Sequence, residues 1–137
     1  GGSFMDNLIG GVYSCKDSKD IYEGRDCYSN KLEIISKTEA KFSFENCTTM
    51  VVYQIKSNIV IDETNKTITF TSFELGDDYK EYVDSYMPFI KQNVAFKISS
   101  DASEIELNLI GIDGDSEYDY STLDSAITTV YTFKKEK

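Results

Sequence analysis

The sequence predicts an all-β fold, an antiparallel meander β-barrel of about eight strands with one short helix. Three observations predict it. Apolar and polar residues alternate with a period of two from Val12 onward, as expected for strands with one buried and one solvated face. The alternating segments are separated by short turns, which join antiparallel neighbours because a parallel crossover needs roughly a dozen residues. The chain of 137 residues contains 10 Tyr and 8 Phe but 1 Pro, a composition that favours strands.

The length fits one domain of this kind. We expect a single domain over residues 4–137, with the opening Gly-Gly-Ser interpreted as an expression scar. A chain of this size buries roughly two-thirds of its unfolded surface, which is enough for a hydrophobic core. A closed barrel is favoured over an open sheet because it leaves no unpaired strand edges.

The strands follow one another along the chain. The first begins near Val12. Further strands are predicted over 31–37, 39–46, 50–56, 58–63, 66–73, 93–99, 104–111 and 126–135. Residues 63–66 (Glu-Thr-Asn-Lys) are expected to form a hairpin turn. Alternation places Val94, Phe96 and Ile98 on one side of their strand, which we expect to be the buried side.

One segment departs from this pattern. Residues 77–92 carry apolar and aromatic side chains at helical spacing, at Tyr79, Tyr82, Val83, Tyr86 and Ile90. Asp77 and Asp78 suit a helix N-terminus, and Pro88 would end or kink the helix near Met87. We expect one short helix packed across an end or a side of the sheet. Two interpretations remain open, an amphipathic cover for the core and a lid over a cavity.

The charge and the absence of histidine exclude many functions. The net charge is −10, and Arg25 is the one arginine, so nucleic acid is not an expected partner. No apolar run reaches the roughly 18 residues that a membrane-spanning helix needs. Without histidine, Ser-His-Asp and Cys-His catalysis and His-ligated zinc are excluded. No pair among the 24 acidic residues carries a catalytic signature, so we expect neither an enzyme nor a cofactor.

The three cysteines predict one disulfide. A β-hairpin register with Phe44 opposite Leu32 makes Cys27 and Cys47 diagonal neighbours, close enough for a bridge if the strand bends. Pairing of Cys15 with either of them, and three free thiols, remain the alternatives. A Cys27–Cys47 bridge favours an oxidising compartment and therefore a secreted or cell-surface location. No Cys-x-x-Cys motif indicates redox catalysis or a zinc cluster.

The acidic segment 111–124 resembles a calcium loop only in its spacing. Counted from Asp113, oxygen-bearing side chains fall at the ligand positions of an EF-hand loop. Position six is Tyr118, where glycine permits the sharp turn, and position twelve is Asp124 rather than the longer Glu. These departures favour a solvated loop over a weak calcium site, and no metal site is predicted.

Two short motifs carry a family resemblance. The segment Gly10–Cys15 (GGVYSC) contains Gly11-Val12-Tyr13, which resembles the Gly-x-Trp pattern of the first strand in lipocalin-like barrels, where it packs the barrel floor. The closing segment VYTFKK resembles the last strand of small lipocalin-like domains in bacterial secreted or surface lipoproteins. The chain thus resembles a lipocalin-like, calycin-type β-barrel, which implies a secreted or surface-attached binding protein.

The predicted function is that of a non-enzymatic β-barrel that binds a small hydrophobic ligand. The aromatic side chains expected to face inward, as core or as the ligand-binding lining, are Phe42, Phe44, Tyr53, Phe70, Phe96 and Tyr131. The tyrosine hydroxyls among them are expected to be polar contacts for the ligand. The alternative is a structural or protein–protein interaction module with a filled barrel and a tyrosine-rich surface.

Overall fold

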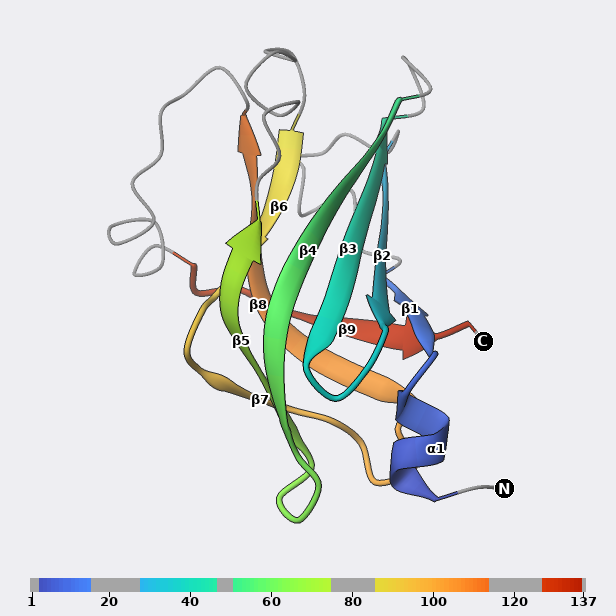
Figure 1. Ribbon diagram of the computed structural model, residues 1–137. Helices are drawn as coiled ribbons and strands as arrows, with labels where there is room; N and C mark the ends of the chain where they lie inside the picture. Colours follow the sequence, from blue (N-terminus) through green and yellow to red (C-terminus); the bar gives the residue numbers. More distant parts are fainter. Residues whose placement is uncertain (1–2, 16–27, 47–50, 75–85, 114–126, 137) are drawn as a thin grey trace.

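The alternating segments form strands over most of the chain that the structure describes. The computed structural model describes residues 3–15, 28–46, 51–74, 86–113 and 127–136. These residues form one antiparallel sheet that curls into a nearly closed barrel with one short helix, which confirms the predicted fold class (Figure 1). The elements are α1 (Phe4–Leu8), β1 (Val12–Ser14), β2 (Tyr28–Ile34), β3 (Glu39–Asn46), β4 (Val51–Asp62), β5 (Thr67–Glu74), β6 (Tyr86–Ile90), β7 (Ala95–Lys97), β8 (Glu104–Asp113) and β9 (Val130–Lys135). The predicted strands 50–56 and 58–63 together form the long strand β4.

The strands follow one another around the barrel in chain order. Each strand from β1 to β4 pairs with the next, and β8 pairs with β9, which returns to β1. β6 and β7 are the two halves of one bent strand between β5 and β8. β6 pairs with β8, and β7 pairs with β5. Just after β7, Ile98 forms a bridge with Ile105. At the bend, Asn93 has a positive φ of 58° and donates its N–H to the Phe70 carbonyl at 2.8 Å. This bent segment closes the barrel between β5 and β8.

The predicted helix over 77–92 is wrong for the part that the structure describes. That part forms β6, which pairs with β8. The Lys91 N–H donates to the Asn108 carbonyl at 2.9 Å, which continues the β6–β8 ladder. In an antiparallel pair every second residue hydrogen-bonds to the partner, so the nitrogen of Pro88, three residues before Lys91, points away from β8. Pro88 therefore costs no hydrogen bond of this ladder and is compatible with a strand. The other part of the prediction, residues 77–85, lies outside the described residues.

The helix that the structure describes, α1, lies near the start of the chain. The Ser3 side chain accepts a hydrogen bond from the Asp6 N–H at 3.2 Å and caps the helix. Ser3, the last residue of the opening triplet, thus takes part in this cap. Leu8 is fully buried, and the Lys135 ammonium donates to the Asn7 carbonyl at 2.6 Å. These contacts hold α1 against one end of the barrel.

That end of the barrel, which we name the closed end, consists of α1 and the turns at 35–38, 63–66 and 98–103 (Figure 1). In the 63–66 turn, the Lys66 ammonium lies 4.7 Å from the centroid of the Phe4 ring on α1. Because neighbouring strands run in opposite directions, β3, β5 and β8 end at the opposite end and β2, β4 and β6 begin there. We name it the far end.

The predicted register between β2 and β3 is wrong by two residues. The structure pairs Leu32 with Phe42, whereas the sequence analysis expects Phe44 opposite Leu32. The turn decides the register, because the Ile35 N–H donates to the Glu39 carbonyl at 3.0 Å and leaves only residues 36–38 between them. A shift of two residues keeps every side chain on the same face, so hydrophobic alternation cannot detect this error.

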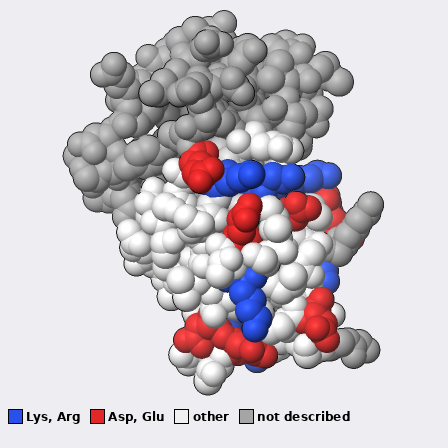
Figure 2. Space-filling view, in the orientation of Figure 1, with Lys and Arg blue, Asp and Glu red and all other residues white. Residues whose placement is uncertain are grey.

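The outer face of the barrel carries mixed charges. Figure 2 shows basic and acidic side chains next to one another on one side, with uncharged surface between them. The Lys41 ammonium lies 3.7 Å from the Glu33 carboxylate, and the Lys31 ammonium lies 3.3 Å from the Glu136 carboxylate. Pairs this exposed contribute little to stability. Among the described residues, no helix has the length and apolar character needed to cross a bilayer.

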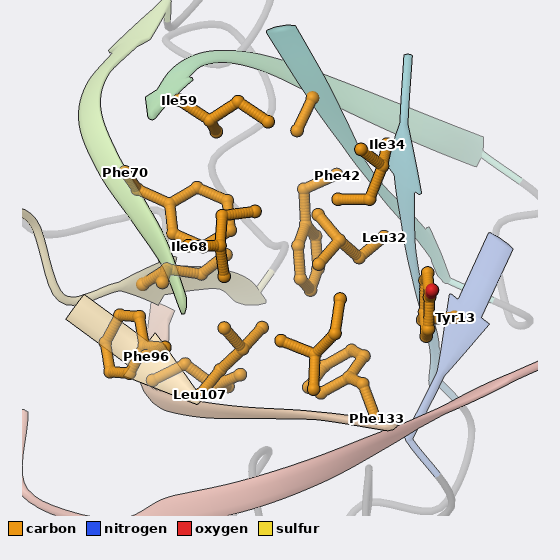
Figure 3. Packing of buried hydrophobic residues seen from close by; sticks show 14 of the residues in the cluster. Tyr13, Leu32, Ile34, Phe42, Ile59, Ile68, Phe70, Phe96, Leu107 and Phe133 are labelled. Atoms are coloured by element: carbon orange, nitrogen blue, oxygen red, sulfur yellow. The ribbon is translucent and has the colours of Figure 1, made fainter. Parts of the chain in front are cut away.

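The inner face forms the hydrophobic core. Buried side chains from all parts of the described barrel meet there, among them Tyr13, Leu32, Ile34, Phe42, Ile59, Ile68, Phe70, Phe96, Leu107 and Phe133 (Figure 3). The predicted inward faces are therefore confirmed for these strands. Val94 is an exception, since it is 36% exposed although Phe96 and Ile98 are buried. Val94 precedes β7 at the bend after β6, where regular alternation is interrupted.

Candidate functional site

The interior of the barrel is the candidate site. At the closed end, Tyr13 bounds this site. Tyr13 is fully buried, and its hydroxyl donates to the Ala102 carbonyl at 2.5 Å. A Cβ on Gly11 would lie 2.9 Å from the Tyr13 ring and 3.0 Å from the Leu8 carbonyl oxygen, so the ring packs where only glycine leaves room. The Gly-x-Tyr motif thus packs the closed end of the barrel.

Burial also changes the acidity of Tyr13. The loss of water around the phenol, followed by the nearby Asp101 carboxylate, raises the pKa of Tyr13 to about 12. The Asp101 carboxylate accepts hydrogen bonds from the Ser103 hydroxyl and N–H and from the Ser99 hydroxyl, which lower its pKa. Tyr13 is therefore neutral at physiological pH and serves as a structural hydrogen-bond donor.

Above Tyr13, aromatic rings fill the barrel. The Phe42 and Phe133 rings meet edge to face with centroids 5.8 Å apart. The Phe70 ring centroid lies 6.3 Å from that of Phe96 (Figure 3). The Phe73 ring stacks on Phe70 with centroids 6.0 Å apart. Three of the six predicted ligand-binding residues, Phe42, Phe70 and Phe96, thus belong to a packed aromatic layer. We name this layer, with Phe73 and Phe133, the floor.

The other three predicted ligand-binding residues lie closer to the far end. Tyr131 is half-buried and packs against the core from β9. The backbone register places Phe44 opposite Tyr53, two residues along β3 and β4 from the pair Phe42 and Ile55. Residues two apart in a strand share a face, so these two positions continue the inner face beyond the floor. The side chains of Phe44 and Tyr53 lie outside the described part of the structure.

Asn30 is a polar residue of this region that the sequence analysis missed. It pairs with Phe44 across β2 and β3, and it is 1% exposed. The sequence does indicate its burial by spacing, because Asn30, Leu32 and Ile34 are two residues apart and therefore share one face of the strand. The one other buried polar residue in the described barrel is Ser57, whose hydroxyl donates to the Ser72 carbonyl at 2.8 Å.

The described inner face beyond the floor is otherwise apolar. Cys15, Ile90 and Leu109 are each buried there, from β1, β6 and β8 or directly next to them. The buried side chains of the described residues include no charged group. A molecule held against this surface would therefore meet hydrocarbon, with the amide of Asn30 and the phenol of Tyr131 as polar groups.

A surface hollow lies beside the middle of β4. It has a volume of about 180 Å³ and is lined by Glu39, Lys56, Ser57, Asn58 and Glu74. Its charged side chains are at least partly exposed, so water can solvate them. The described residues contain no group of three or more side chains suited to bind a metal ion. The described part of this hollow therefore lacks a cluster suited to bind a metal ion, and the barrel interior is the better candidate.

Two predictions concern residues outside the described part of the structure. The cysteines of the predicted disulfide, Cys27 and Cys47, lie outside the described residues, whereas Cys15 is buried. The acidic segment 111–124 is described only as far as Asp113, which ends β8 opposite Tyr86. The predicted disulfide and the preference for a solvated loop thus stay predictions.

Comparison with known proteins does not assign a family. No protein-family model matches the chain. Searches of curated proteins and of solved structures find no significant match. The geometry of this barrel is therefore the basis for a function.

Proposed function

We propose that the protein is a lipocalin-like, non-enzymatic β-barrel that binds a small hydrophobic ligand between the floor and the far end. The observation that carries the proposal is that aromatic rings and α1 fill and cover the closed end, while the inner face stays apolar beyond the floor. Barrels of eight strands are wide enough either to fill with side chains or to hold one small ligand. A cup with a solid floor and an apolar wall suits the second use.

Two features support the lipocalin-like part of the proposal. The strands run in chain order around the barrel and return to β1, which makes a nearly closed meander. The resemblance at Gly11-Val12-Tyr13 has a structural counterpart, because Tyr13 packs over Gly11 at the closed end. A secreted or surface-attached location follows from the same resemblance and from the predicted disulfide.

A fluorescence titration with Nile red, an uncharged hydrophobic dye, tests the proposal. We expect saturable binding of one dye per chain. The variant Leu109→Trp adds bulk to the inner face beyond the floor and should weaken binding by at least about tenfold. The matched control is Val130→Trp, because Val130 is exposed on the outer face opposite Asn108 and should tolerate the ring.

The outcomes distinguish dye binding inside the barrel from dye binding on its outer surface. Circular dichroism and melting curves should show that both variants remain folded. Unsaturable binding by the wild type would contradict the proposal. So would a Val130→Trp variant that loses dye binding while Leu109→Trp keeps it, because the dye would then occupy the outer surface.

The packed floor also favours a second candidate, an interaction module with a filled barrel. Phe42, Phe70 and Phe96 are already in close contact with other rings, as a filled barrel requires. Such a module would bind no dye, and its stability would not change when hydrophobic compounds are added. A rise in melting temperature with dye concentration would contradict it, because only binding to the native state stabilises that state.

A further inference from the structure

We propose that Asn65 accepts an N-linked glycan when the chain passes through a eukaryotic secretory pathway. The proposal rests on the secreted or surface-attached location proposed above and does not depend on ligand binding. The sequence contains two Asn-x-Ser/Thr triplets of the kind that such a pathway modifies, Asn46-Cys47-Thr48 and Asn65-Lys66-Thr67. Triplets of this kind also occur by chance, so the place of each asparagine in the fold decides between them.

Asn65 lies in the turn between β4 and β5, where it is exposed. Its side-chain amide donates to the Asp62 carboxylate at 2.8 Å, and its backbone N–H donates to the same carboxylate at 3.0 Å. A primary amide carries two N–H groups, so this bond leaves the second N–H for substitution. A sugar attached to Nδ2 can therefore extend into solvent while the hydrogen bonds to Asp62 still hold the turn.

The other two residues of this triplet also belong to the surface of the closed end. Lys66 has a positive φ of 53°, and its ammonium lies 4.7 Å from the centroid of the Phe4 ring on α1. Thr67 begins β5 and is partly exposed. Because Ile68 is fully buried, its neighbour Thr67 faces the outer side of the barrel. The whole triplet is thus presented outside the core.

Asn46 has a different place in the fold. It is the last residue of β3 and pairs with Tyr28 on one side and Val51 on the other. It follows Phe42 and Phe44 at intervals of two, so its position continues the inner face of the barrel. An oligosaccharide attached on this face would compete for an interior wide enough for one small ligand. The folded protein should therefore carry its glycan at the turn and not at the end of β3.

The modification is a group transfer from a lipid-linked oligosaccharide diphosphate, catalysed by a transferase of the secretory pathway. Nδ2 of Asn65 forms a bond to the anomeric carbon of the first sugar and releases one proton. The bond between that carbon and the phosphate oxygen breaks, and the lipid diphosphate leaves with the electron pair. The transferase recognises a hydroxyl two residues after the asparagine, which Thr67 supplies.

Expression of the full chain behind a cleavable signal peptide in cultured eukaryotic cells tests the proposal. We expect the secreted protein to carry one glycan, which peptide N-glycosidase removes, and mass spectrometry of the peptides should locate it at Asn65. Asn65→Gln and Thr67→Ala should each abolish the glycan, whereas Thr67→Ser should retain it. The matched control is Asn46→Gln, which should leave the glycan in place.

A secreted wild type without a glycan would overturn the proposal, and so would a glycan that persists in Asn65→Gln. Thr67→Ala retains Asn65 and its hydrogen bonds to Asp62, so its loss of the glycan cannot be attributed to a broken turn. Cell lysate is analysed together with the medium, so that a variant retained in the cell still gives a result. Nile red titration of the same proteins distinguishes this proposal from the proposed function. The turn lies at the closed end, so removal of the glycan should not change dye binding, and absence of dye binding would remove only the proposed function.

Discussion

Tyr13 combines three properties in one residue, since it packs over Gly11, donates to the Ala102 carbonyl and loses all contact with water. Its phenol must remain protonated to keep this arrangement. An ionised phenolate at the same place would be a buried charge close to the Asp101 carboxylate, which explains why the pKa is raised. The closed end of the barrel is therefore sensitive to alkaline pH at one identifiable residue, Tyr13.

The pH dependence of stability follows from this shift. The pKa of Tyr13 is about 12 in the folded protein and about 10 in the unfolded chain, so Tyr13 stabilises the fold fully below pH 10. As pH rises from 10 to 12, the unfolded chain releases the proton first, and roughly 2–3 kcal/mol of this stabilisation is lost. Urea denaturation of the wild type and of Tyr13→Phe from pH 8 to 12 measures it.

The difference between their free energies of unfolding reports on Tyr13 alone, because every other tyrosine and lysine titrates in both proteins. We expect the free energy of unfolding of the wild type to fall relative to Tyr13→Phe above pH 10. A constant difference over this range would show that the Tyr13 phenol ionises as easily in the folded protein as in the unfolded chain.

At the scale of elements, α1 has only five residues and cannot be stable alone. Its stability comes from Leu8, which is fully buried, and from the contacts of Lys135 and Lys66 with α1. We predict that Leu8→Ala lowers the free energy of unfolding by about 2–5 kcal/mol in urea denaturation. Asp6→Ala, at an exposed position of the same helix, should cost less than about 1 kcal/mol. Similar losses for both would mean that α1 does not seal the core.

The observed register of the β2–β3 hairpin changes the geometry predicted for the disulfide. The described ladder ends with Tyr28 opposite Asn46, and the next residue of each strand is a cysteine, Cys27 and Cys47. In this register the two cysteines would be directly opposed rather than diagonal. Opposed residues have Cα atoms about 4.5–5.5 Å apart, within the range of disulfides. We therefore predict a Cys27–Cys47 bridge in protein prepared under oxidising conditions.

Mass spectrometry after alkylation measures this bridge. Without reduction, denatured protein should take up one alkyl group, at Cys15, and reduction should raise this to three. Native protein should react slowly at Cys15, because that residue is buried. Three alkyl groups without reduction would contradict the bridge, and a bridge that includes Cys15 would contradict the pairing.

For the molecule as a whole, alternation was enough to predict the barrel and its inner face, because burial on one side enforces the period of two. It was not enough for the register of β2 and β3, since a shift of two residues keeps the same faces. The helical spacing around Pro88 was misleading because the partner of β6 is β8, which local sequence does not reveal. Asn30 was missed because it precedes the predicted strand 31–37 and is polar, although it shares the spacing of Leu32 and Ile34.

The proposed division of the barrel into a packed floor and a binding region makes a prediction that neither region makes alone. Phe42 and Phe44 occupy the same face of β3, two residues apart. Phe42 meets the Phe133 ring within the floor, so Phe42→Ala should lower the free energy of unfolding by about 3–5 kcal/mol. Under the proposed function Phe44 contacts the ligand, so Phe44→Ala should cost clearly less.

The effects on ligand binding should be reversed. In Nile red titrations, Phe44→Ala should weaken binding several-fold, and Phe42→Ala should change it little under conditions where that variant stays folded. Urea denaturation and dye titration on the same two proteins give all four values. Equal losses of stability with no change in dye binding would mean that side chains pack solidly past the floor. The filled interaction module would then be the better account of this barrel.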